Sequence, residues 1–199
     1  LDGGLEDEKI NREYLKRADR SVERMINIVE DLQEISQLES GELELEMDRF
    51  DIVFLAKEIL ETQELKAKEK NISLVLLQDL SQPIFVIADR NRIRQVVTNL
   101  VVNSIRYGKE NGETKIRFQE SGENIFVEIA DNGIGISKEH QPRIFERFFR
   151  ADKSRSREQG GTGLGLSIVK HIIEAHKQTI NVISTEGVGS TFSFTLKKG

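Results

Sequence analysis

The feature that most constrains this chain is an apolar strand that ends in a carboxylate and a glycine turn, Asp131-Asn132-Gly133-Ile134-Gly135-Ile136. Glycine tolerates positive φ and lets another group approach the backbone closely, so the turn presents Asp131 at the rim of a cavity. A carboxylate in that position suits a flat ring that carries hydrogen-bond donors. An ordinary Asp-Asn-Gly β-turn explains the stretch equally well on its own, so three further stretches decide between the two interpretations.

The charge is distributed unevenly along the 199 residues. The first 48 residues hold 15 acidic and 6 basic side chains, whereas the remainder holds 19 acidic and 23 basic ones. The net charge therefore changes from -9 to +4. This shift predicts a domain preceded by an appendage, residues 1–40 and 41–199. A mildly basic body argues against a strongly cationic nucleic-acid-binding module but allows a pocket for a polyanion.

The sequence contains no cysteine and no apolar run of the ~20 residues needed to cross a bilayer. The first observation excludes disulfides, thiolate metal sites and cysteine nucleophiles, and it suits a reducing compartment. We expect a cytoplasmic chain without a membrane segment, whether or not a parent protein is anchored in an inner membrane. The start, Leu1-Asp2-Gly3-Gly4, is typical of a helix end, so we expect the body of that helix to precede residue 1.

A long amphipathic helix is predicted from Glu6 to Leu38, because its apolar residues recur at spacings of three and four. The apolar stripe is too wide for one acidic helix to bury by itself. It therefore predicts partner helices in a hairpin or a dimeric bundle. A helix that packs on its own domain is the alternative. The core of the stripe consists of Tyr14, Ala18, Ser21, Met25, Ile28, Leu32 and Ile35.

Strands and helices mix in the rest of the chain without regular alternation. Asp51 and Asp89 are predicted N-caps of helices that run to about Lys70 and Tyr107, and a third helix is expected over 166–176. Residues 43–47 alternate like an edge strand, and further strands are expected over 72–77, 84–88, 115–119, 125–130, 179–184 and 191–196. This order predicts an α+β fold, a two-layer sandwich with one mixed sheet and its helices on one face.

Two asparagines on the predicted 90–107 helix are the first of the three deciding stretches. Asn99 and Asn103 lie four residues apart, so both amides project from one face. Their neighbours Val96, Leu100 and Val101 place this face near the core, where an unsatisfied amide is costly. Amide oxygens are hard ligands, so they suit Mg²⁺ held together with water and phosphate oxygens. Two solvent-facing polar residues are the alternative.

The other two stretches are 144–150, where aromatic residues alternate with arginines, and the glycine-rich run 160–166. Phe145, Phe148 and Phe149 are expected to hold the polar segment that follows against the body of the domain, and that segment is expected to be mobile. The glycine run leads directly into a helix, whose N-terminus favours an anion. It lacks the lysine of the common phosphate loop and does not directly follow a strand, so it carries little weight alone.

Taken in order, these four stretches resemble the N, G1, F and G2 boxes of sensor histidine kinases: 99–103, 131–136, 145–150 and 161–166. The resemblance implies the ATP-binding sandwich shared with DNA gyrase, the mismatch-repair ATPases and the large heat-shock chaperone. It also implies that residues 5–40 correspond to the second helix of the dimerisation and histidine-phosphotransfer hairpin. The expected ligands are ATP and Mg²⁺, and the expected partners are a response regulator receiver domain and, in the full-length protein, a second copy.

Residue roles follow from the same resemblance. Asp131 would accept from the adenine amino group, Gly133, Gly135 and Ile136 would shape the adenine pocket, and Asn103 would hold Mg²⁺ with support from Asn99. Asn99 also stands where the ATPase relatives keep a glutamate base, which favours transfer over hydrolysis. Arg106 and Tyr107 would lie near the phosphates, where lysine is the commoner basic residue, and Arg150 would approach the γ-phosphate. The remaining predicted ATP-binding residues are Phe145, Gly161, Thr162, Gly163, Leu164, Gly165 and Leu166.

The phosphoacceptor histidine of the family is the one part with no counterpart in this chain. His140, His171 and His176 are the histidines present, and none has the expected acidic and proline neighbours. We expect all three to be structural. Two hypotheses follow. The chain is either the ATP-binding kinase portion of a sensor histidine kinase whose acceptor histidine lies upstream, or a non-catalytic module in which nucleotide controls the binding of a partner.

Overall fold

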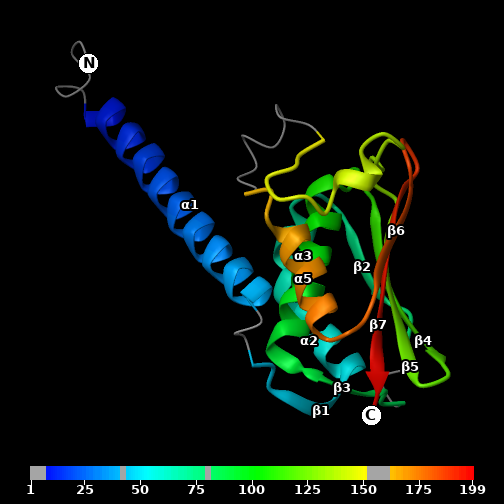
Figure 1. Cartoon of the computed structure of the whole chain (residues 1–199). Helices are drawn as coiled ribbons and strands as arrows, with labels where there is room; N and C mark the ends of the chain where they lie inside the picture. The colour runs from blue at the N-terminus through cyan, green and yellow to red at the C-terminus, as the bar shows by residue number, and fades with distance from the viewer. Residues whose placement is uncertain (1–7, 41–43, 79–81, 152–161) are drawn as a thin grey trace.

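The computed structural model describes residues 8–40, 44–78, 82–151 and 162–199. In Figure 1, helices pack on one face of a sheet and a long helix projects away from them. The long helix is α1 (Glu8–Ser40), and the packed helices are α2 (Ile52–Lys68), α3 (Arg90–Tyr107) and α5 (Gly165–Ala175). The strands are β1 (Met47–Asp51), β2 (Ser73–Leu76), β3 (Phe85–Asp89), β4 (Glu113–Ser121), β5 (Asn124–Asp131), β6 (Ile180–Thr185) and β7 (Gly189–Lys198).

The seven-stranded sheet is mixed, as predicted. Its order is β1-β3-β7-β5-β4-β2, with β6 paired to β7. The pair β2–β4 is parallel, and the other pairs are antiparallel. Alternate residues of β5 point into the core, and the inner faces of the helices cover them. The predicted α+β sandwich is therefore confirmed.

Both predicted N-caps are present. Asp51 Oδ1 accepts from the backbone N–H of Val53 at 3.0 Å, and Asp89 Oδ1 accepts from those of Asn91 and Arg92 at 3.0 Å. These bonds satisfy N–H groups that have no partner within the helix. The second cap fixes where α3 begins, and therefore which of its residues face the cleft described below.

The first strand differs from its prediction. It covers Met47–Asp51 instead of 43–47, and Leu43 lies outside the described residues. The alternation of apolar and acidic residues before Met47 resembles a strand, but Met47 itself is exposed while Phe50 is buried. The register is thus set by Phe50, and Asp51 serves both as the strand end and as the cap of α2.

Helix α1 forms as predicted, but the other described residues pack against only part of it. Ile35 is fully buried, and Ile28 also packs against the core, whereas the N-terminal part projects from the domain. Its exposed apolar side chains include Tyr14, Leu15, Val22, Met25, Ile26 and Val29. Neither α1 nor any other helix in the described ranges combines the length and apolarity needed to cross a membrane.

Candidate functional site

An elongated cleft follows the inner side of α3 and consists of two adjoining halves. The apolar half is lined by residues from α3, the turn after β5, the segment 144–151 and the start of β7, among them Ser104, Asp131, Ile134, Gly135, Ile136, Ser190 and Phe192. The polar half is lined by Asp31, Gln95, Asn99, Val102, Arg106, Thr162, Gly163, Gly165 and Ile168. Both halves share Asn103, Tyr107, Ile144, Phe149, Arg150 and Leu166.

Asp131 is the carboxylate of the apolar half. Its Oδ1 accepts from the backbone N–H of Gly133 at 2.8 Å, and the backbone N–H of Ser190 is a second donor. Burial raises the pKa of Asp131, although these two hydrogen bonds and Lys109 oppose the shift. An ionised carboxylate can accept about four hydrogen bonds, so Asp131 retains capacity for a donor placed in the cleft.

The two glycines of the turn are needed for protein packing as much as for ligand access. Gly133 does not have positive φ, but a Cβ there would lie 2.5 Å from the Tyr107 carbonyl oxygen. Gly135 has φ of +68°, and its Cβ would lie 2.0 Å from the Thr185 carbonyl oxygen. Gly135 thus uses the positive φ that glycine tolerates, whereas at Gly133 a close backbone contact excludes a side chain.

Hydrogen bonds on both sides hold this turn in place. The N–H of Ile134 donates to the Tyr107 carbonyl at 3.1 Å, which ties the turn to the end of α3. The N–H of Ile136 donates to Ser184 Oγ at 2.8 Å, and Gln141 Nε2 donates to the carbonyls of Ile136 and Ser184 at 2.9 Å. The position of Asp131 relative to α3 is thus fixed by backbone contacts.

The polar half places amides and cations on one side. Asn99 and Asn103 line it together, as their spacing predicts, and Arg106 follows on the same helix. Lys70 Nζ donates to the carbonyls of Ile105 at 3.1 Å and Arg106 at 2.7 Å. A cation at a helix C-terminus satisfies carbonyls that lack partners, so Lys70 stabilises the turn of α3 that carries Arg106.

The start of α5 forms the opposite wall. Thr162 Oγ1 accepts from the backbone N–H of Leu164 at 3.2 Å and donates to Asp31 Oδ2 at 3.0 Å. Thr162 therefore connects α1 to the N-terminus of α5, while Gly163 and Gly165 line the cleft between them.

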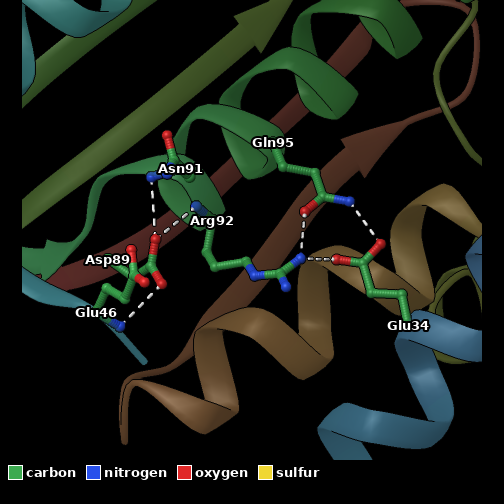
Figure 2. A network of polar contacts seen from close by, with 6 residues as sticks. All are labelled: Glu34, Glu46, Asp89, Asn91, Arg92 and Gln95. Carbon is green, nitrogen blue, oxygen red and sulfur yellow. Dashed lines mark hydrogen bonds and ion pairs between the residues drawn. The ribbon is translucent and has the colours of Figure 1, made fainter. Parts of the chain in front are cut away.

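A second polar contact connects α1 to α3 just outside this wall. Glu34 forms an ion pair with Arg92 and accepts from Gln95 Nε2 at 2.7 Å. Figure 2 shows Glu34 reaching across to both side chains, with Arg92 near the Asp89 cap. Because Ile35 is buried beside it, this segment of α1 is held against the domain by packing and by charge.

The cleft brings together most of the predicted site residues. Those that line it are Asn99, Asn103, Arg106, Tyr107, Asp131, Gly135, Ile136, Arg150, Thr162, Gly163, Gly165 and Leu166. Gly133 and Leu164 are buried instead, and Phe145 packs edge-on against Phe192 with ring centroids 6.5 Å apart. Phe145 therefore acts through Phe192, which lines the apolar half. Gly161 and the polar segment 152–160 lie outside the described residues.

Several lining residues have no clear signal in the sequence. Ser190 and Phe192 belong to β7 and reach the cleft because Asp131 pairs with Ser190 across the sheet, a register that periodicity does not give. Ser104 faces Thr114, whose Oγ1 donates to Ser104 Oγ at 2.9 Å. Asp31 lies in the acidic helix and could not be distinguished from its neighbours without the packing of α1.

The histidines make contacts with neighbouring protein groups. His176 is buried, accepts at Nε2 from the Asp89 N–H at 3.0 Å and donates from Nδ1 to the Ile172 carbonyl at 2.7 Å. Burial lowers the pKa of His176, and it also lowers the pKa of the half-buried His171. His140 Nδ1 lies 3.0 Å from Ser137 Oγ.

A mixed sheet with helices on one face, and a cleft with a half-buried carboxylate at one end and amides and arginines towards the other, define the class of ATP-binding α+β sandwiches. Residues 88–199 match the family described as histidine kinase-, DNA gyrase B-, and HSP90-like ATPase. The chain belongs to this family and carries a histidine kinase catalytic domain.

Curated relatives are sensor kinases of greater length. The chain is 34% identical to sensor histidine kinase WalK of Bacillus subtilis over 98% of this chain and 32% of that protein. It is 35% identical to the circadian input-output histidine kinase CikA of Synechococcus elongatus over 92% of this chain and 24% of that protein. The chain thus spans about a quarter to a third of these relatives.

Solved structures agree with this assignment. The catalytic domain of histidine kinase ThkA is 34% identical, with a TM-score of 0.68, over 77% of this chain and 97% of that one. ThkA in complex with response regulator protein TrrA is 29% identical, with a TM-score of 0.76, over 97% of this chain and 53% of that one. Full-length ShkA in complex with AMPPNP is 25% identical, with a TM-score of 0.79, over 94% of this chain and 39% of that one.

Proposed function

We propose that this chain binds MgATP and transfers the γ-phosphoryl group to a histidine upstream of residue 1, for relay to an aspartate of a response regulator. The donor set of the cleft is the observation that carries the proposal. Asp131 lies in the apolar half and Asn99 and Arg106 in the polar half, while Asn103 and Arg150 line both.

The apolar half suits an adenine ring. Asp131 offers an acceptor for the exocyclic amino group, and Ile134, Ile136 and Phe192 supply flat apolar surface for the ring faces. Partial burial makes the match selective, because a ring without a donor would cover the remaining acceptor capacity of the carboxylate without pairing it. The ShkA structure, determined in complex with AMPPNP, supports a nucleotide as the ligand.

The polar half suits a metal-bound triphosphate. Arg106 and Arg150 provide positive charge, and the Asn103 amide oxygen is the proposed protein ligand of Mg²⁺, with Asn99 one turn earlier. When bound, Mg²⁺ supplies charge neutralisation for the phosphate oxygens. At this place α3 offers amides instead of a carboxylate, which favours transfer to a protein nucleophile over activation of water.

The long helix has a separate proposed role. We assign residues 1–40 to the dimerisation and histidine-phosphotransfer hairpin and residues 41–199 to the ATP-binding domain. The exposed apolar side chains of α1, such as Tyr14, Met25 and Val29, support a helical partner in a full-length homodimer. The ThkA–TrrA complex supports a response regulator as the partner that receives the phosphoryl group.

Labelling with radioactive ATP tests the kinase proposal against the non-catalytic alternative. The chain alone should acquire no acid-labile phosphate, whereas a separately supplied hairpin with the upstream helix should be labelled. Asn103→Ala should abolish labelling by removing the proposed Mg²⁺ ligand, and Asn181→Ala, at an exposed position of β6, is the matched control.

Two results would contradict this proposal in different ways. Acid-labile phosphate on His140, His171 or His176 would show that the acceptor lies within this chain. A hairpin that stays unlabelled while nucleotide binding is intact would favour the module in which nucleotide controls partner binding.

A further inference from the structure

Helix α1 contacts the domain through two carboxylates with different surroundings. Asp31 and Glu34 lie three residues apart, so they share one face of the helix. Glu34 pairs with Arg92 and Gln95 on α3, and Arg92 does not line the cleft (Figure 2). Asp31 lines the polar half and accepts from Thr162 Oγ1 at 3.0 Å. Glu34 therefore holds α1 against α3, whereas Asp31 itself lines the cleft.

Asp31 lies beside groups of the polar half that would attract a phosphate. Its partner Thr162 also accepts from the N–H of Leu164, the residue that precedes α5. The positive end of the α5 dipole and the two arginines that line the polar half would attract the phosphate of a ligand to the same region. The carboxylate of α1 thus lies where the proposed function requires phosphate oxygens.

A phosphate placed in the polar half beside the Asp31 carboxylate costs free energy. Burial raises the pKa of Asp31, with Glu34 and Glu30 adding to the shift and the Thr162 hydrogen bond opposing it. The ionised carboxylate is therefore already disfavoured before any further anion arrives. A phosphate brought into the same half adds repulsion and competes for the Thr162 hydroxyl.

We propose that Asp31 determines the affinity for ATP. While α1 is docked on the domain, the Asp31 carboxylate and the terminal phosphate of ATP repel each other, so each disfavours the binding of the other. The inference rests on the proposed nucleotide site. By linkage the coupling is reciprocal: docked α1 weakens ATP binding, and bound ATP weakens the docking of α1 by the same factor. The effect grows with the charge at the phosphate end, so it is largest for ATP, smaller for ADP and absent for adenosine.

Calorimetric titration of ATP, ADP and adenosine into the wild type and Asp31→Asn tests the charge dependence. Asparagine keeps an acceptor for Thr162 but removes the charge. We expect ATP to bind about 5-fold more tightly or better to the variant, ADP by a smaller factor and adenosine unchanged. Asp19→Asn removes the same charge from an exposed position of α1 and should change none of the three affinities.

A distance measurement tests the reciprocal effect. The sequence contains no cysteine, so Glu23→Cys on α1 and Gln119→Cys on β4 allow specific spin labels at two exposed positions. ATP should broaden and lengthen the distance distribution more than ADP does. The same nucleotide should cause a smaller change when Asp31→Asn is present.

Each contrary result has a definite meaning. Equal tightening for adenosine, or no change for ATP, would overturn the coupling while leaving the nucleotide site intact. Weaker ATP binding by Asp31→Asn in Mg²⁺ would overturn it as well and would assign Asp31 to the metal. A wild-type chain that binds none of the three compounds would refute the proposed function itself, and this inference with it.

Discussion

The two halves of the cleft are built in different ways. The apolar half takes Asp131, Ser190 and Phe192 from the adjacent strands β5 and β7. These strands pair along the whole of β5. Its turn is joined to the β6–β7 connection by the Gly187 N–H, which donates to the Ile134 carbonyl at 2.7 Å. Among the described residues, the polar half has no lining from the sheet and takes it from α1, α3 and two segments, 144–150 and 162–168.

This difference means that the apolar half is held rigidly, whereas the polar half can change when a helix moves. Backbone hydrogen bonds to the sheet and to the end of α3 hold Asp131 and its turn in a fixed place, so the apolar half is preorganised. The polar half depends on side-chain contacts between helices, such as Asp31 with Thr162 and Glu34 with Arg92. Such contacts break at lower cost than a paired strand, so the phosphate end is where movement of a helix can change function.

The largest expected effect tests how tightly the apolar half is packed. Gly135→Ala should destabilise the domain by about 2 to 4 kcal/mol, because positive φ and a contact 2.0 Å from the Thr185 carbonyl both oppose a Cβ. Gly122→Ala is the matched control, since Gly122 has φ of +60° but no atom within 4 Å of the added Cβ. Urea unfolding measures both, and equal losses would show that the turn is not tightly packed.

The second effect concerns recognition at the same end. Asp131→Asn should weaken binding of ATP and ADP by about 1 to 3 kcal/mol, because one acceptor oxygen becomes a donor in a buried site. Asp48→Asn makes the same change on exposed β1 and should leave affinity unaltered. Titration calorimetry with both nucleotides gives the comparison. Unchanged affinity in Asp131→Asn would remove this residue from the proposed adenine site.

The features that lie within one strand, turn or helix were the more predictable part of the molecule. The strand that ends at Asp131 and the glycines after it are adjacent in sequence, so a local pattern is enough to identify them. Asp89 likewise predicts the start of α3, and the spacing of Asn99 and Asn103 then places both amides in the cleft. Local chemistry therefore identified the elements and the residues that each contributes.

Long-range contacts account for what the sequence did not reveal. Ser190 reaches the cleft through strand register, and Asp31 through the packing of a separate helix. Gly133 and Leu164 have the residue types of a ligand-binding loop, yet the structure buries both. Whether such a residue touches a ligand or supports the wall behind it depends on packing that no local pattern encodes.

The smallest expected effect concerns the contact that holds together the helices of the polar half. His176, which follows α5, accepts from the N–H of Asp89, the cap of α3. Burial lowers the pKa of His176 from its ordinary value of 6.5, so the unfolded chain binds a proton more readily than the folded chain. The stability that His176 contributes is therefore present above about pH 6.5 and is lost as the pH falls.

His176→Gln keeps a side chain that can donate and accept but cannot titrate, so it isolates this contribution. Between pH 7 and pH 5 the wild type should lose at most about 2 kcal/mol more unfolding free energy than the variant. Urea unfolding at several pH values measures the difference, and His140→Gln serves as the control at a histidine outside this contact. Parallel pH profiles for the wild type and His176→Gln would show that protonation of His176 does not loosen the link between α5 and α3. The pH response of the polar half would then have to come from a carboxylate, and Asp31 is the one that lines this half among the described residues.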